Sequence, residues 1–131
     1  AMDQQIACFE RQIELSERHN KPLIIHLVKA TDELIKLHKA YKPSQEWIVH
    51  GFRGKPEVYQ MLRSQGIKVS IGAKFNKETL NRIPLNELLI ETDTSDVGIE
   101  EIAENIAILK NRSIQGLIYQ IYKNTTGIFF R

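Results

Sequence analysis

Residues 46–51 read EWIVHG, and this short stretch gives the first indication of the fold class. An apolar run of strand character, residues 47–49, ends on His50 and a glycine. The same arrangement occurs twice more, because residues 22–27 read PLIIHL and residues 88–93 read LLIETD. One histidine at a strand end needs only local hydrogen bonds to explain it. Three strands that each end near a metal-binding type of side chain indicate a shared site.

Helical patterns separate these strands along the whole chain. The expected strands cover residues 23–28, 47–50, 67–71 and 88–92, and the expected helices cover residues 3–19, 31–41, 56–65, 76–83, 99–110 and 114–123. Alternation of strands and helices, with strands that are apolar almost throughout, is typical of parallel sheets covered by helices. The sequence therefore predicts an α/β fold.

The polar residues at the strand ends are candidate metal ligands. In parallel sheets and barrels, ligands bind at the carboxyl ends of the strands. His26, His50 and Asp93 lie at or next to these ends, so we predict that they converge in one pocket. Imidazole and carboxylate together suit zinc, manganese, iron or nickel better than calcium or magnesium. Their wide spacing excludes a zinc-finger pattern and favours a catalytic site with open coordination positions.

Glu91 lies two residues before Asp93, so both side chains point to the same side of the expected strand. Two interpretations of Glu91 remain open. It lies near the metal or supports a ligand, or it is a carboxylate that forms a salt bridge within the sheet.

Length and composition exclude several classes of protein. The chain has 131 residues, enough for one domain with a hydrophobic core, and its net charge of +2 gives no strong basic field. No apolar run approaches the roughly 20 residues that cross a bilayer, and the first residues have no signal-peptide pattern. The single cysteine, Cys8, has no partner for an internal disulfide. These features predict a cytoplasmic protein that is not attached to a membrane.

Several motifs occur in an order that resembles the TatD family of metal-dependent deoxyribonucleases. They are PLIIH (22–26), IVHGFRG (48–54), GIKVSIGA (66–73), LLIETD (88–93) and a closing IYKNTTGIFF (121–130). Each motif alone is weakly specific, but the ordered set covers nearly the whole chain.

The resemblance implies a distorted TIM barrel of the amidohydrolase type. It implies that His26 and His50 hold one of two divalent metal ions, for which zinc, magnesium and manganese are candidates. It also implies that Asp93 binds the other ion and handles the attacking water. Two metal ions on either side of a phosphodiester suit phosphoryl hydrolysis, which makes DNA the expected substrate.

The sequence departs from the family at two places. Members usually have an arginine two residues after the first matched histidine, where this chain has Val28 followed by Lys29. The usual proline after the E-T-D-x motif is Ser95 here, followed by Asp96. Substrate contacts are therefore expected to differ. We take Glu91, Lys29 and Arg53 as candidates for contacting the substrate or supporting the metal ligands.

Length indicates that only part of a barrel is present. A complete barrel needs roughly 250 residues and eight strands. We therefore expect residues 1–131 to be a single partial domain, the C-terminal half of a TIM-type barrel with about four parallel strands. The H-x-H motif and the metal-bridging glutamate of the family would precede residue 1.

A half-barrel has consequences for activity and assembly. We expect the chain to be inactive alone, and its exposed sheet edges predict a homodimer. Two alternative functions remain open: hydrolysis of a small amide or ester by the same ligands, and a half-barrel without catalytic activity.

Overall fold

The computed structural model describes residues 2–26, 31–92 and 98–129. Its sheet has four parallel strands in the order β1-β2-β3-β4, which are β1 (Leu23–Ile25), β2 (Trp47–Val49), β3 (Lys68–Ile71) and β4 (Leu89–Ile90). The helices are α1 (Met2–His19), α2 (Thr31–Tyr41), α3 (Pro56–Ser64), α4 (Lys77–Arg82), α5 (Ile99–Leu109) and α6 (Ile114–Phe129), with a 3-10 turn η1 (Leu85–Glu87) before β4. The predicted α/β fold with four parallel strands is confirmed.

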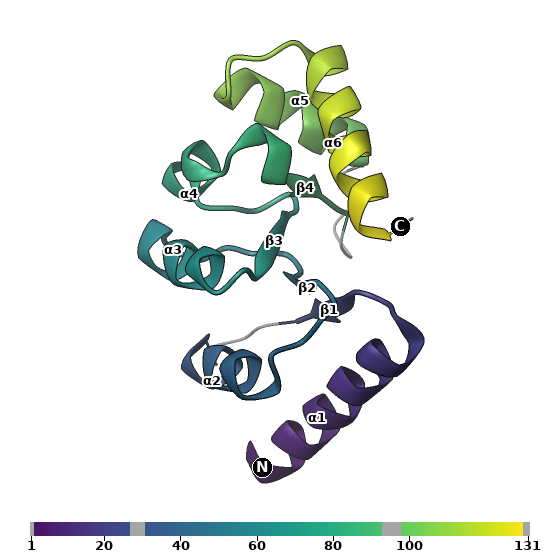
Figure 1. Ribbon diagram of the computed structural model, residues 1–131. Coiled ribbons are helices and arrows are strands. Elements are labelled where there is room, and N and C mark those ends of the chain that lie inside the picture. The colour runs from purple at the N-terminus through teal and green to yellow at the C-terminus, as the bar shows by residue number, and fades with distance from the viewer. Residues whose placement is uncertain (1, 27–30, 93–97, 130–131) are drawn as a thin grey trace.

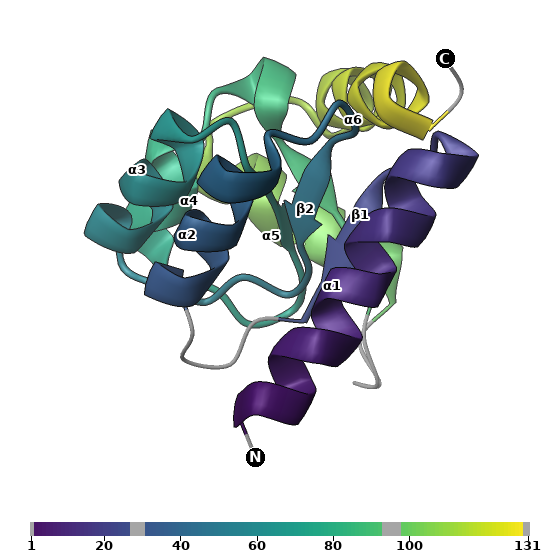
Figure 2. The same cartoon turned by 60° about the horizontal axis from the view of Figure 1, so that its bottom comes forward.

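The helices form layers on both sides of this sheet. Figure 1 shows α2, α3 and α4 stacked along one side of the strands. α1 lies beside β1 at one end of the sheet, and α5 and α6 lie beside β4 at the other. In Figure 2, α1 and α6 lie to the right of β2 and α2, α3 and α4 to its left, and α1 and α2 both contact the Trp47 ring. Within the described ranges, no helix has both the length and the apolar composition to cross a membrane.

Alternate strand residues point to opposite faces of a sheet, and both faces are used here. The main core packs strand residues against the helices; it includes Leu23, Ile25, Trp47, Val49, Val69, Ile71, Ile13, Leu34, Tyr59, Leu62, Leu80, Ile102, Ile106 and Leu117. On the other face, Ile48 and Leu89 form a small cluster with Ile128 of α6. β2 is therefore buried on both faces, which explains why residues 47–49 form an uninterrupted apolar run.

Two predicted boundaries are wrong. The strand predicted at 88–92 is only two residues long, because η1 occupies the chain immediately before it. The last helix was expected to end near residue 123, where two threonines and a glycine follow, but it continues to Phe129. The threonines do not stop it because Thr125 Oγ1 donates to the carbonyl oxygen of Ile121 (2.8 Å), and Ile128 is buried against the sheet.

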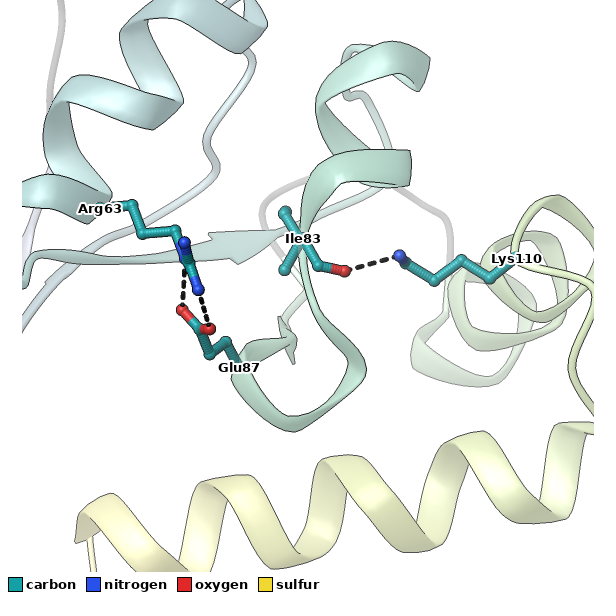
Figure 3. A network of polar contacts seen from close by, with 4 residues as sticks. All are labelled: Arg63, Ile83, Glu87 and Lys110. Carbon is teal, nitrogen blue, oxygen red and sulfur yellow. Dashed lines mark hydrogen bonds and ion pairs between the residues drawn. The ribbon is translucent and has the colours of Figure 1, made fainter.

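Side-chain contacts fix the segment that leads into β4. Figure 3 shows the Arg63 guanidinium facing the Glu87 carboxylate, with two hydrogen bonds of 3.0 and 2.8 Å, while Lys110 Nζ donates to the carbonyl oxygen of Ile83 (2.6 Å). The hydrogen bonds from Arg63 lower the pKa of Glu87, and burial lowers the pKa of Lys110. Asn124 Nδ2 donates to the carbonyl oxygens of Leu85 (2.8 Å) and Leu88 (2.9 Å). A strand as short as β4 is thus positioned largely by the contacts of the residues that precede it.

The outer edge of β1 has no neighbouring strand in the described sheet. Leu23 N–H donates to the Glu46 carbonyl oxygen, and the Ile25 carbonyl oxygen accepts from His50 N–H, both at 2.8 Å. Backbone groups alternate in direction along a strand, so Ile24 directs its N–H and C=O away from β2. Its side chain is also 39% exposed, so this edge combines backbone hydrogen-bonding groups with an apolar side chain.

We propose that two copies of the chain pair through this edge. Ile24→Lys places a charge there, a substitution that blocks pairing between sheet edges. Light scattering at micromolar concentration is expected to give twice the 15.1 kDa chain mass for the original protein. For Ile24→Lys it should give the mass of one chain. Ile118→Lys, which changes an exposed isoleucine of α6, is the matched control and should remain a dimer. A monomeric original chain would contradict the proposal.

His38 of α2 packs against the core, although the residues around it on the helix include the charged Lys36 and Lys39. Its ring is half-buried and meets the buried Trp47 ring edge to face, with centroids 4.9 Å apart. Burial lowers the pKa of His38, against the opposing effects of a hydrogen bond with Gln65 and the charge of Glu46. The helical period alone gave no sign of this contact, because His38 lies at the border between the apolar and polar faces.

The lowered pKa of His38 predicts a pH-dependent stability. The unfolded chain takes up a proton on this imidazole near pH 6.5, while the folded chain resists protonation until a lower pH. The free energy of unfolding is therefore expected to fall as the pH drops below about 6.5. Urea unfolding at pH 7 and pH 5.5 measures this loss, and His38→Gln should lose less stability between these pH values. An equal loss in both proteins would assign the pH dependence to other groups.

Candidate metal centre

The carboxyl ends of β1, β2 and β4 position the candidate side chains. Ile25 and Val49 are paired in the register of β1 and β2. His50 N–H donates to the carbonyl oxygen of Ile25 (2.8 Å), so the hydrogen bonding between the strands extends one residue past the end of β2. On the other side of β3, Glu91 N–H donates to the carbonyl oxygen of Ile71 (3.0 Å). His26, His50 and Glu91 therefore each follow a strand directly, and the neighbouring strand holds the backbones of His50 and Glu91.

The structure brings the two predicted histidine ligands together. The rings of His26 and His50 have centroids 4.8 Å apart and an interplanar angle of 64°. His26 is exposed, whereas the His50 side chain is only 27% exposed. Both imidazoles are thus accessible from the carboxyl face of the sheet. Asp93 and Lys29, the predicted catalytic aspartate and a predicted substrate contact, lie outside the described residues.

Glu91 links the ends of two strands. Its Oε1 accepts a hydrogen bond from Gly51 N–H, and its Oε2 is in contact with His50 Nε2. This side chain is only 9% exposed, and Oε2 is buried without a partner in hydrogen-bond geometry. Gly51 has φ +63°, a left-handed conformation that glycine adopts without steric cost. Glu91 therefore contacts the candidate ligand His50, and among the described residues this histidine is its charged-type partner.

The loop after His50 is held in a fixed shape. Phe52 N–H donates to the carbonyl oxygen of Ser70 (2.9 Å), and the Phe52 ring is buried. A Cβ at Gly54 would lie 2.5 Å from this ring, so the second glycine of the motif leaves space for Phe52. Thr79 Oγ1 donates to the carbonyl oxygen of Gly54 (2.7 Å). Arg53, between the buried phenylalanine and this glycine, is exposed on the same loop.

Sequence reasoning missed the role of Gly51 as a hydrogen-bond donor to Glu91. The signal that could have revealed it is a glycine directly after the candidate ligand His50, since such a position allows a left-handed turn and an exposed N–H. The contact partner is 40 residues away and could not be identified from local spacing.

The fit of these side chains to a metal ion depends on their donor atoms and on their arrangement. Two imidazoles and one carboxylate form a donor set suited to zinc or another transition metal. Glu91 Oε2 is buried against His50 Nε2, so a carboxylate group lies directly beside this candidate ligand. Among the described residues, however, no group of three or more His, Cys, Asp or Glu side chains is arranged to hold a metal. The described residues therefore fit part of a metal centre.

Parallel strands that carry imidazoles and a carboxylate at their carboxyl ends have the arrangement found at the active-site face of (β/α) barrels. The family model for TatD related DNase matches residues 1–130, and the chain belongs to the TatD family. The resemblance inferred from the ordered motifs is confirmed.

Curated relatives include metal-dependent hydrolases and nucleases. An uncharacterized metal-dependent hydrolase of Haemophilus influenzae is 30% identical over 98 residues, which cover 70% of this chain and 37% of that protein. The human protein named 3'-5' RNA nuclease TATDN2 is 32% identical over 100 residues, covering 69% of this chain and 13% of that protein. Deoxyribonuclease Tat-D of Schizosaccharomyces pombe is 29% identical over 98 residues, covering 70% of this chain and 31% of that protein. The matched region is thus less than two-fifths of each of these relatives.

Solved structures show the same fold. The TatD homologue YJJV of Escherichia coli superposes with a TM-score of 0.85 at 21% identity, and a TatD family hydrolase of Entamoeba histolytica superposes with a TM-score of 0.82 at 17% identity. Each match covers 98% of this chain and 57% of the other structure. These neighbours are TIM-barrel proteins, which confirms the predicted barrel-type architecture.

Proposed function

We propose that this chain contributes part of the active site of a metal-dependent phosphodiesterase that acts on DNA. The observation that carries the proposal is the adjacency of the His26 and His50 rings at the carboxyl end of the sheet, with Glu91 beside His50. Family membership supports hydrolysis. The names of two relatives, a deoxyribonuclease and an RNA nuclease, support a nucleic acid as the substrate.

The residues of the chain have separate roles in this proposal. His26 and His50 would hold a divalent cation, with Asp93 as a further ligand that orients the attacking water. When bound, the cation supplies a Lewis acid that polarises the phosphoryl group. Arg53 and Lys29, which follow the two histidine-bearing strand ends in sequence, would contact the phosphates that flank the scissile bond.

Activity of the chain by itself is expected to be low. Among the residues that the structure describes, the side chains around His50 do not form a group of three metal ligands. A cation bound by an incomplete ligand set is held weakly, so only a small fraction of molecules would carry it at micromolar metal concentration.

Hydrolysis of labelled single-stranded DNA, labelled RNA and a small ester in the presence of Mn²⁺ tests the proposal. We expect slow cleavage of DNA that His26→Gln and EDTA both remove. His19→Gln, a substitution of an exposed histidine on α1, is the matched control and should keep the original rate. Cleavage that persists in His26→Gln would refute the proposed centre. Faster cleavage of the ester than of either nucleic acid would favour a different hydrolase.

A further inference from the structure

We infer that Glu91 is a positioning residue that uses one carboxylate to fix both the His50 ring and the loop that follows it. The inference rests on the proposed function, since it gives His50 the role of a metal ligand. It adds a residue that influences metal binding indirectly, through the His50 side chain and the Gly51 backbone.

Glu91 is well placed to hold two groups at once. Its own backbone is anchored, because Glu91 N–H donates to the carbonyl oxygen of Ile71 (3.0 Å). From this position Oε1 accepts from Gly51 N–H and Oε2 touches His50 Nε2. The side chain is almost fully buried, so water competes poorly for either contact. A buried carboxylate with two fixed neighbours can restrain the orientation of both.

The carboxylate reaches across one strand of the sheet. Glu91 follows β4 and His50 follows β2, and β3 lies between these strands. The pairing of Ile71 with Ile90 places Gly72 opposite Glu91 at the end of β3. Aspartate is one methylene shorter than glutamate and would not span the same distance.

The charge of Glu91 also distinguishes the two ring nitrogens of His50. A carboxylate oxygen beside Nε2 favours the neutral tautomer with its proton on Nε2, which leaves the lone pair of Nδ1 open. Carboxylates that hold metal-binding histidines in this way raise metal affinity, and their removal typically lowers it about 10–100-fold. Glu91 thus determines the orientation of His50 and the nitrogen that it offers.

The first test is the zinc affinity of Glu91→Gln, measured by titration calorimetry. The glutamine Oε1 can still accept from Gly51 N–H, but the negative charge beside His50 is lost. We expect the affinity for Zn²⁺ to fall about 10–100-fold. Glu78→Gln, which removes an exposed carboxylate of α4, is the matched control and should leave zinc affinity unchanged. An unchanged affinity in Glu91→Gln would overturn the inference, and so would a loss as complete as that in His50→Ala, because it would make Glu91 a ligand.

The second test needs no metal ion. Proton–nitrogen correlation spectra of the histidine rings report which nitrogen carries the proton. In the metal-free protein, Glu91→Gln is expected to shift the His50 ring signals and the Gly51 amide signal while the His19 ring signals stay in place. Unchanged His50 signals would overturn the positioning role. If zinc does not bind to the original chain, the metal centre of the proposed function fails, and this spectrum alone decides whether Glu91 positions His50.

Discussion

Trp47→Ala is expected to destabilise the fold by about 3–5 kcal/mol, the usual loss when a large aromatic side chain is removed from a core. Trp47 is 1% exposed and meets the Phe9 ring edge to face, with centroids 5.6 Å apart, and the His38 ring at 4.9 Å. Its removal would leave a cavity bordered by β2, α1 and α2. Since small domains have about 5–15 kcal/mol of total stability, this substitution would leave the chain close to unfolding.

Trp47→Phe is the matched comparison. Trp47 Nε1 is buried without a hydrogen-bond partner in the described structure, so the indole N–H contributes no such bond to stability. Phenylalanine keeps much of the aromatic packing and removes this unsatisfied group. Urea unfolding monitored by far-ultraviolet circular dichroism should therefore show a clearly smaller loss for Trp47→Phe than for Trp47→Ala. Equal losses would mean that the indole N–H has a partner in solution.

His50→Ala is expected to remove zinc binding almost completely. The substitution deletes one of two adjacent imidazoles and also leaves Glu91 Oε2 without its neighbour. Because loss of a residue that only supports a ligand costs about 10–100-fold in metal affinity, loss of the ligand itself should cost more than about 100-fold. Titration with Zn²⁺ at constant pH measures the effect, with circular dichroism to verify that the variant is folded.

The matched control for His50→Ala is His19→Ala. His19 is an exposed histidine in the last turn of α1, so its removal changes the number of imidazoles without changing the candidate centre. It should retain the zinc affinity of the original chain. Zinc binding reduced equally by both substitutions would indicate nonspecific binding to surface histidines.

The sequence was sufficient to predict the elements that carry strong local signals. Residues 47–49 are apolar because β2 is buried on both faces, and Pro56 begins α3 at the predicted position. The position of His26 next to His50 also follows from general rules, because parallel strands bring their carboxyl ends to one edge of the sheet. These inferences need only the spacing of apolar residues along the chain and the arrangement of strands in a parallel sheet, and the structure agrees with them.

Contacts between distant segments could not be predicted in the same way. The contact of Glu91 with Gly51 and His50 depends on a side chain that crosses the end of β3, and the contact of His38 with Trp47 depends on the rotation of α2 against the sheet. Neither contact produces a periodic pattern in the sequence. The predicted roles of Asp93 and Lys29 remain predictions, since these residues lie outside the described structure.

The anchoring of β4 has a consequence for the order in which the chain can fold during synthesis. Asn124 supplies hydrogen bonds to the carbonyl oxygens of Leu85 and Leu88, which lie 39 and 36 residues earlier in the chain. β1, β2 and β3 are hydrogen-bonded to one another in sequence order, so this part of the sheet can pair before α6 is made, although Ile48 gains its contact with Ile128 only afterwards. β4 must wait until α6 has been made. The strand that precedes Glu91 is therefore the last of the four to become fixed, and Glu91 reaches its place beside His50 only after α6 has been made.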